Sequence, residues 1–289
     1  ISNLSCSATH HSQLTTYNYN LQFLITSYYF RMIGGIFIKA NDPKYLARWY
    51  EDNLGIGFGT GIYFSFKWRN LVQTNDIGYT VFSFFPENTD YFYPGTSDSM
   101  INLRVADLDN LRIRLMQNGV EVDDKVESYD YGRFGWAIDC DGNKIELWEP
   151  VDRAFDDYHK PLELFGHVTG LGGIFLKCSD VQQSVEFYSK NFGMDFTTSY
   201  YDMQWRDLNQ PDVIENTYLS FFSQDSKYFG RSSKDFMLNF RVKHLEELLK
   251  ELRSSEIEVD ENMETYDYGK FGWIYDPEGN RIELWEPVA

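Results

Sequence analysis

The chain has 289 residues, of which 43% are hydrophobic, and its 26 basic and 44 acidic side chains give a formal net charge of -18. This composition is typical of a globular protein with a sizeable core, and no apolar run approaches the roughly 18 residues that would span a bilayer. The negative charge repels phosphate backbones, so nucleic acid is not expected as a partner.

Residues 1–31 are rich in Ser, Thr, Asn and Tyr and carry no charge before Arg31. They lack the basic start and the small-residue cleavage site of a secretory signal. We expect translation to start at Met32, which would make this segment an extension outside the natural protein. His10 and His11 lie in it, and no function is expected for them.

Strand and helix patterns alternate from Met32 onward. Residues 34–40 alternate as a strand, and Asp42-Pro43 then supplies an N-cap with proline at the first helical position. A helix with apolar residues every three to four positions follows and ends at Gly55.

The rest of this unit reads as strands around a second helix. Runs rich in aromatic and β-branched residues predict strands at 62–68, 79–86 and 100–106. A helix carrying Leu108, Leu111 and Leu115 comes next and stops at Asn118-Gly119. Two last strands, 134–139 and 144–150, are joined by a hairpin signal, Asp141-Gly142-Asn143.

The same order of elements is then repeated. YDYGRFGWAIDCDGNKIELWEP from Tyr129 returns as YDYGKFGWIYDPEGNRIELWEP from Tyr266, and the first strand returns from Gly172. A repeat of this length, roughly 100–150 residues, is a normal domain size. We therefore expect an extension at 1–31, a first domain at 32–152, a linker at 153–170 and a second domain at 171–289.

The three cysteines do not form a disulfide framework. Cys140 and Cys178 correspond to Pro277 and Ala40 in the other repeat, so no pair is kept. A reducing, cytoplasmic location is expected.

The order of elements, with the strings FYSKNFGM, RFGWAIDCDGNKIELWEP and KFGWIYDPEGNRIELWEP, resembles the vicinal-oxygen-chelate superfamily of glyoxalases, bleomycin-resistance proteins and extradiol dioxygenases. The resemblance covers almost everything after Met32. It implies an α+β fold in which each domain has two βαβββ halves, and these curl a mixed sheet into a half-open cup with helices outside. In metal-dependent members, four side chains hold a cation in the cup. Fold alone does not fix function.

The ligand positions implied by this resemblance hold other residues here. Only the last-strand carboxylate is kept, as Glu146 and Glu283, whereas the remaining positions carry Gly35, Phe82 and Met100 in the first repeat and Gly173, Leu219 and Met237 in the second. One carboxylate cannot hold zinc, nickel or iron, which need about three to four protein donors. We therefore assign no metal ligand and expect no cofactor, with an atypical divalent-metal site as the weaker alternative. His159, His167 and His244 do not match ligand positions and are expected at the surface.

Strand parity predicts what fills the cup instead, because residues in register with the lost ligands point inward. The first domain is expected to contribute Phe37, Lys39, Phe82, Met100, Asn102, Arg104, Glu146 and Trp148. The second is expected to contribute Phe175, Lys177, Met237, Asn239, Arg241, Glu283 and Trp285. Nearly all of these positions are identical in the two repeats, whereas the first helices share fewer than a third of their residues.

Two interpretations of this inward set remain open. Lys39, Arg104 and Glu146 could form one buried ion network that only neutralises itself. Alternatively, the Lys and Arg could anchor an anionic or carbonyl-bearing group in a small-molecule pocket with aromatic walls.

The sequence favours a protein that binds a small organic ligand without the family's metal site, in the way that the resemblance to bleomycin-resistance proteins implies. The alternative is an enzyme of the lyase, isomerase or dioxygenase type on a small carbonyl or vicinal-oxygen substrate, with Glu146 or Glu283 as general base. Whether the chain is an enzyme stays open. The two domains are expected to pack together like the subunits of a homodimer, because both carry Trp and Tyr side chains that need a partner.

Overall fold

The structure is a computed structural model that describes residues 30–151 and 166–288. His10, His11, His159 and most of the expected extension and linker lie outside the described residues.

The first domain runs from strand β1 to strand β7. Its elements are β1 (Phe30–Ala40), α2 (Pro43–Leu54), β2 (Tyr63–Arg69), β3 (Ile77–Pro86), β4 (Ser99–Val105), α3 (Leu108–Gln117), β5 (Glu127–Tyr129), β6 (Gly132–Ile138) and β7 (Lys144–Pro150).

The second domain repeats this order and adds one short 3-10 helix. Its elements are β8 (Val168–Cys178), α4 (Val181–Phe192), β9 (Tyr200–Arg206), β10 (Ile214–Ser223), η2 (Lys227–Phe229), β11 (Phe236–Val242), α5 (Leu245–Ser254), β12 (Val259–Tyr266), β13 (Gly269–Tyr275) and β14 (Arg281–Pro287).

The predicted boundaries of the first helix are confirmed. The Asp42 side chain accepts hydrogen bonds from the backbone N–H groups of Lys44 and Tyr45, and Pro43 needs no such partner. Gly55 ends the helix in the left-handed conformation (φ 69°), which glycine adopts without a Cβ penalty.

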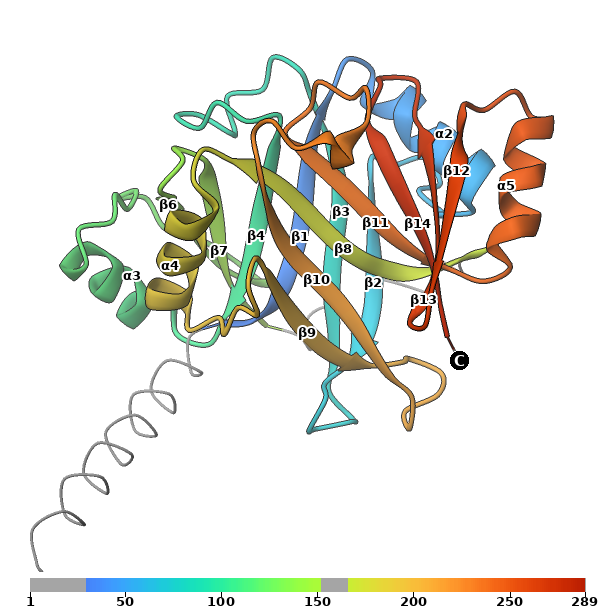
Figure 1. The fold of residues 1–289 in the computed structure, drawn as a ribbon. Coiled ribbons are helices and arrows are strands. Elements are labelled where there is room, and N and C mark those ends of the chain that lie inside the picture. Colours follow the sequence, from blue (N-terminus) through green and yellow to red (C-terminus); the bar gives the residue numbers. More distant parts are fainter. Residues whose placement is uncertain (1–29, 152–165, 289) are drawn as a thin grey trace, which may run out of the picture.

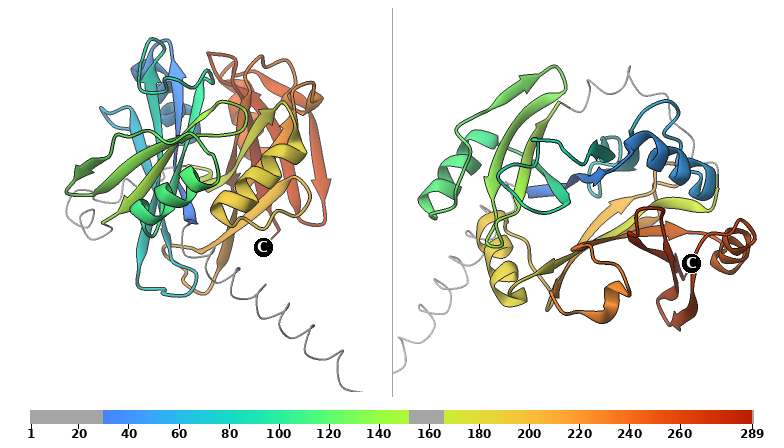
Figure 2. Two further views of the ribbon diagram at one scale, coloured as in Figure 1. Left: turned by 90° about the vertical axis from the view of Figure 1, so that its left-hand side faces the viewer. Right: turned by 90° about the horizontal axis from the view of Figure 1, so that it is seen from above.

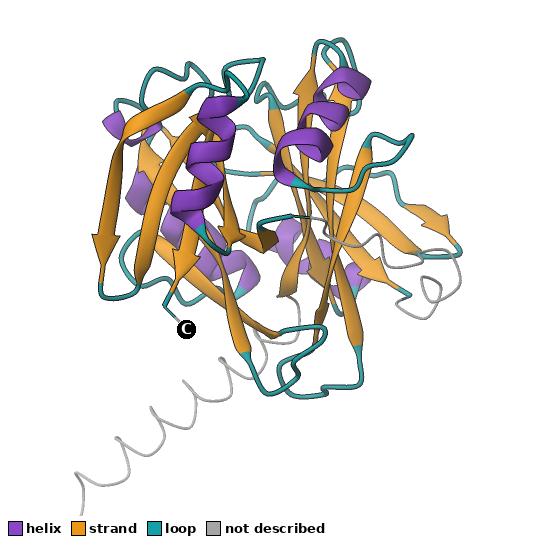
Figure 3. Ribbon diagram, turned by 90° about the vertical axis from the view of Figure 1, so that its right-hand side faces the viewer, coloured by secondary structure: helices purple, strands orange, loops and turns teal. Residues whose placement is uncertain are grey.

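Within the described ranges, 14 strands form one mixed sheet in the order β12-β13-β14-β11-β8-β10-β9-β2-β3-β1-β4-β7-β6-β5 (Figure 1). The two domains meet where β2 lies beside β9, at the pair Arg69 and Arg206. The helices lie on the outer side of the strongly curved sheet (Figure 3). The predicted α+β fold is therefore confirmed, with one difference in detail. The first half of each domain has two strands after its helix, because a loop (residues 87–98 in the first domain) leads directly into the second half.

One helix of each domain contacts the other domain. The Tyr50 hydroxyl on α2 donates to Asp276 in the β13–β14 turn (3.0 Å), and the Tyr188 hydroxyl on α4 donates to Asp139 in the β6–β7 turn (3.1 Å). Accordingly, α4 lies beside α3, and α2 lies near β14 and α5 (Figures 1 and 2). One continuous apolar core joins the helix-facing side chains of both domains.

In the described ranges, no helix is both long and apolar enough to cross a bilayer. His167 and His244 lie together at the start of β8 and of α5, with ring centroids 6.2 Å apart, and the His167 Nδ1 contacts the Lys243 carbonyl oxygen (2.8 Å). His167 is partly exposed and His244 is exposed, and neither belongs to the cup-facing cluster of Phe175, Phe229, Met237 and Trp273.

Candidate functional site

A second, smaller apolar cluster fills the concave face of the first domain. Phe37 on β1, Met100 on β4 and Trp136 on β6 are buried there against Phe92, which comes from the loop after β3. Partly buried Val81, Phe85, Tyr91 and Phe134 complete the cup wall. The predicted inward positions of Phe37 and Met100 thus agree with the structure.

Glu146 lies at the base of this cup and is 1% exposed. Its Oε1 accepts a hydrogen bond from the Asn102 Nδ2 (2.6 Å), and its Oε2 accepts from the Trp136 Nε1 (3.1 Å) and from the Tyr91 hydroxyl. The parallel pairing of β4 with β7 sets Asn102 directly beside Glu146. Both carboxylate oxygens are therefore occupied by donors from three different elements of the domain.

The second domain builds the same network. Glu283 is 1% exposed and accepts hydrogen bonds from the Asn239 Nδ2 (2.5 Å), the Trp273 Nε1 (2.9 Å) and the Tyr228 hydroxyl. Phe175, Phe229, Met237 and Trp273 form its apolar cluster. The two cups are thus two copies of one arrangement.

The electrostatics of each cup follow from burial. Burial raises the pKa of Glu146 and of Glu283, and the hydrogen bonds from Tyr, Asn and Trp counteract this rise. Burial and the neighbouring carboxylate raise the pKa of Tyr91 and Tyr228, so the phenolic protons stay on the tyrosines. Each carboxylate is a strong hydrogen-bond acceptor and a potential base, but it already accepts a hydrogen bond from the tyrosine hydroxyl.

A cation that sequence reasoning did not single out holds the tyrosine loop in place. The Lys144 Nζ donates to the Tyr91 carbonyl oxygen (2.9 Å) and lies 5.1 Å from the centre of the Trp136 ring. In the second domain, Arg281 donates to the Tyr228 carbonyl oxygen and lies over the Trp273 ring (4.9 Å). Burial lowers the pKa of Lys144.

The structure does not bring Lys39 and Arg104, the two basic residues predicted to act as a pair, close to each other. In the register of β1, Arg104 lies beside Met32, seven residues from Lys39, which corresponds to roughly 20 Å along a strand. The Lys39 Nζ lies over the Phe92 ring (5.4 Å), whereas the Arg104 guanidinium lies 4.8 Å from the Trp148 ring.

The second domain separates its basic residues in the same way. Lys177 lies over Phe229 (4.6 Å), whereas Arg241 lies 4.8 Å from the Trp285 ring and pairs with Glu215. The interpretation of Lys39, Arg104 and Glu146 as one ion network is therefore wrong, because the donors to the carboxylate in each cup are neutral.

The prediction for Phe82 is also wrong, because its side chain faces the helices and not the cup. It pairs with Ile36 in the parallel β1–β3 register and packs edge-on against Tyr50 of α2, with ring centroids 5.3 Å apart. Phe84 shares this face, as do Leu219 and Phe221 in the second domain. The sequence parity of β3 was assigned one residue out of step, and Val81 and Phe85 face the cup instead.

The residues in the cup do not fit the divalent cation that the fold family implies. At Gly35, a Cβ atom would lie 2.8 Å from the Val81 carbonyl oxygen and 2.9 Å from the Phe37 ring, so there is no room for a ligand side chain. Met100 supplies only a thioether, and Glu146 is already saturated with donors. Among the described residues, no group of three or more His, Cys, Asp or Glu side chains could hold a metal ion.

The donors Tyr91 and Trp136, with Tyr228 and Trp273, were not assigned to the site from the sequence. A signal was present, because Tyr91-Phe92 returns as Tyr228-Phe229 in loops that otherwise share only Asp98 and its counterpart Asp235. An identical pair inside a divergent loop indicates residues that contact something conserved between the repeats. The positions repeated along the strands could not reveal this contact, since the contact depends on the path of the loop.

Comparison with known proteins supports the fold. The sequence profile described as Glyoxalase/Bleomycin resistance protein/Dioxygenase superfamily matches residues 165–284, the second domain. No curated protein matches the chain.

Solved structures with this fold include dioxygenases and a glyoxalase. The 2,3-dioxygenase LapB from Pseudomonas sp. KL28 is similar with a TM-score of 0.56 at 13% identity, over 91% of this chain and 94% of that one. Homoprotocatechuate 2,3-dioxygenase from Arthrobacter globiformis gives 0.56 at 15% identity, over 90% and 80%. The Mn(II)-bound glyoxalase from Novosphingobium aromaticivorans gives 0.52 at 13% identity, over 91% and 83%. At these identities the likeness concerns the fold.

Proposed function

Because the chain belongs to the Glyoxalase/Bleomycin resistance protein/Dioxygenase superfamily, we propose that it is a metal-independent member that binds a small phenolic molecule in each cup. The observation that carries this proposal is the carboxylate network around Glu146, which recurs around Glu283. In both cups, hydrogen-bond donors of the protein already occupy the carboxylate oxygens.

The Tyr91 side chain indicates the class of ligand. It presents a phenol hydroxyl to the Glu146 carboxylate from a loop, and its ring stacks on Phe85 (5.2 Å between centroids, 7° between planes). A phenolic ligand that displaces Tyr91 would meet the same acceptor and the same aromatic wall. Val81, Phe85, Tyr91 and Phe134 are the partly exposed members of the cup wall and would border the entry path.

A thermal-shift assay tests this proposal with two matched probes. 4-Methylphenol should stabilise the full chain, because a ligand at 100 times its Kd adds about 2.7 kcal/mol to the folded state. 4-Methylanisole has a similar shape but no hydroxyl donor, so its shift should be much smaller. The double variant Glu146→Gln and Glu283→Gln should lose the difference between the probes. Equal shifts with both probes, or an unchanged difference in the double variant, would refute the proposal.

A second candidate function is metal-free acid–base catalysis of the lyase or isomerase type. It is favoured by the raised pKa of Glu146 and Glu283, since a carboxylate with a raised pKa is a better base near neutral pH. Turnover of the hemithioacetal of methylglyoxal and glutathione in the presence of a chelator would support it. The same turnover should be lost in the double Gln variant, and activity that the chelator abolishes would instead indicate a metal enzyme.

The reciprocal contacts of Tyr50 and Tyr188 with the opposite domain support a further part of the proposal. The chain would be a covalent counterpart of a homodimer, with both cups in one molecule. Binding of the phenolic probe should then approach two equivalents per chain.

A further inference from the structure

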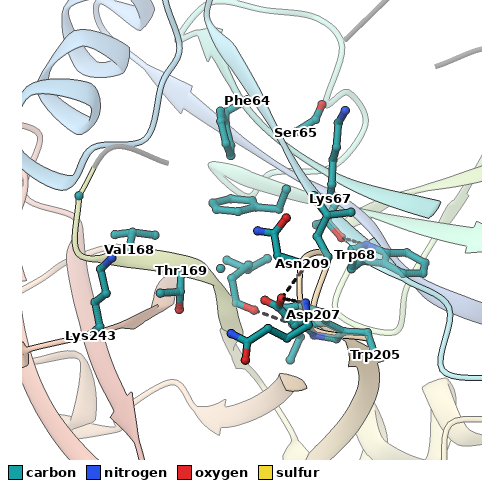
Figure 4. A pocket seen from close by; sticks show the side chains of 18 residues that line it. Phe64, Ser65, Lys67, Trp68, Val168, Thr169, Trp205, Asp207, Asn209 and Lys243 are labelled. Atoms are coloured by element: carbon teal, nitrogen blue, oxygen red, sulfur yellow. Dashed lines mark hydrogen bonds between the residues drawn. The ribbon is translucent and has the colours of Figure 1, made fainter. Parts of the chain in front are cut away.

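A cavity of about 650 Å³ lies between the two domains, outside both cups. Its walls come from β2 of the first domain, from the start of β8 and from the turn that follows β9 (Figure 4). This volume is in the usual range for small-molecule sites. We propose that this cavity binds one amphipathic anion per chain, with an extended apolar body and a single carboxylate or sulfonate group.

The apolar part of the cavity is rigidly built. Its walls are formed by aromatic and aliphatic side chains of both domains, namely Phe64, Phe66, Trp68, Val168, Leu171 and Trp205. The Trp68 Nε1 donates to the Thr80 hydroxyl (3.1 Å) and the Trp205 Nε1 to the Thr217 hydroxyl (3.0 Å). Because both indole N–H groups are already paired, the two tryptophans present apolar ring surface to a ligand.

The polar groups favour an anion at one side. Lys243 and Thr169 stand together next to Val168, whereas the Lys67 side chain points away from the middle of the cavity (Figure 4). The backbone N–H of Lys243 donates to the His167 carbonyl oxygen (2.9 Å), which fixes this residue beside the start of β8. An anionic head group at this side would meet the ammonium group and the Thr169 hydroxyl.

The acidic residue in the cavity is compensated within the protein. The Asp207 Oδ1 accepts hydrogen bonds from the backbone N–H groups of Asn209 (2.8 Å) and Gln210 (2.7 Å). Its charge also interacts with Arg241, whose pKa is lowered by burial and raised by this neighbour. The Lys243 ammonium group is therefore placed to attract a negatively charged ligand to this side of the cavity.

The internal repeat offers two related positions for such a cavity, and their residues differ. Phe30 is the counterpart of Val168, and at the equivalent place it packs edge-on against Tyr201, with ring centroids 5.9 Å apart. Ala106 is the counterpart of Lys243. The smaller valine leaves space, and the lysine adds a charge, at only one of the two related positions. A ligand held here should therefore bind once per chain.

Isothermal titration calorimetry of the full chain with dodecanoate and with dodecan-1-ol tests the inference. The repeat itself suggests two substitutions, because Val168→Phe and Lys243→Ala each introduce the residue that the other copy carries. Val168→Phe should weaken the binding of both probes by about tenfold or more. Lys243→Ala should weaken dodecanoate roughly fivefold to tenfold and leave dodecan-1-ol almost unchanged.

Lys250→Ala, which removes the same charge from the exposed face of α5, serves as the control and should bind both probes like the native chain. Native affinity for dodecanoate in both Val168→Phe and Lys243→Ala would overturn the inference, as would two equivalents of dodecanoate per chain. Binding of 4-methylphenol should persist in Val168→Phe, so that failure of the inter-domain site and failure of the cup proposal are distinguishable. Lys243 is exposed, so its variant reports on binding even if Val168→Phe fails to fold.

Discussion

Removing the Tyr91 hydroxyl tests the cup network most sharply. Tyr91→Phe keeps the ring that stacks on Phe85 but deletes one of the three donors to Glu146. The carboxylate is 1% exposed, so water cannot easily replace the lost donor. Asn102 and Trp136 would then hold it alone.

The magnitude follows from the charge of the acceptor. A hydrogen bond to a charged group contributes about 1.5–3 kcal/mol, and an unsatisfied buried group adds a cost of similar size. We therefore expect Tyr91→Phe to lower the free energy of unfolding by about 2 kcal/mol at pH 7. Tyr93→Phe is the matched control, because Tyr93 is two residues away and 75% exposed. It should change stability by less than about 0.5 kcal/mol.

The pH dependence identifies the mechanism. The Tyr91 hydroxyl lowers the pKa of Glu146 against the dominant effect of burial, so its loss raises the folded-state pKa further above the unfolded value. Stability is then lost as the pH rises from the unfolded pKa of about 4.3 toward the folded pKa. The difference between Tyr91→Phe and the native chain should therefore be small near pH 4 and larger near pH 8.

Urea denaturation at several pH values provides this measurement. A loss below about 0.5 kcal/mol, or a loss that is the same at every pH, would refute the reasoning. The first result would mean that the hydroxyl does not support the carboxylate. The second would mean that Tyr91 contributes packing alone.

Three further predictions concern the loop, the domain contact and the lost ligand position. Lys144→Met removes the hydrogen bond to the Tyr91 carbonyl oxygen, so amide exchange in residues 87–98 should become faster and stability should fall by about 1 kcal/mol. Unchanged amide exchange would refute this role of Lys144. Burial raises the pKa of Asp276 to about 6, so this group should make stability fall by up to about 3 kcal/mol as the pH rises from about 4 to about 6. Asp276→Asn should flatten that part of the curve, and an unchanged curve would contradict the assignment. Gly35→His should destabilise the fold without creating a zinc site, whereas stoichiometric zinc binding would show that the cup has room for a ligand.

The sequence was most informative where a local pattern determines local structure. Asp42-Pro43 and Gly55 bound α2 as expected, since capping depends on neighbouring residues only. The repeat likewise indicated two equivalent domains, and the alternation of β1 and β4 correctly placed Phe37 and Met100.

The failures arose where the site depends on contacts between distant segments. The parity of β3 was assigned without its register to β1, so Phe82 was placed on the wrong face. Lys39 and Arg104 share a face but not a position along it, and parity carries no information about that distance. Tyr91 reaches Glu146 from a loop, and no periodic pattern predicts the path of a loop.

The central claim is that hydrogen-bond donors, and not a metal ion, occupy the cup carboxylates. Elemental analysis of the full chain, after incubation with excess Mn²⁺, Fe²⁺ or Zn²⁺ and desalting, tests it most directly. The arrangement around Glu146 and Glu283 predicts far less than one metal ion per chain. One or two equivalents of metal that disappear in the Glu146→Gln and Glu283→Gln double variant would contradict the claim.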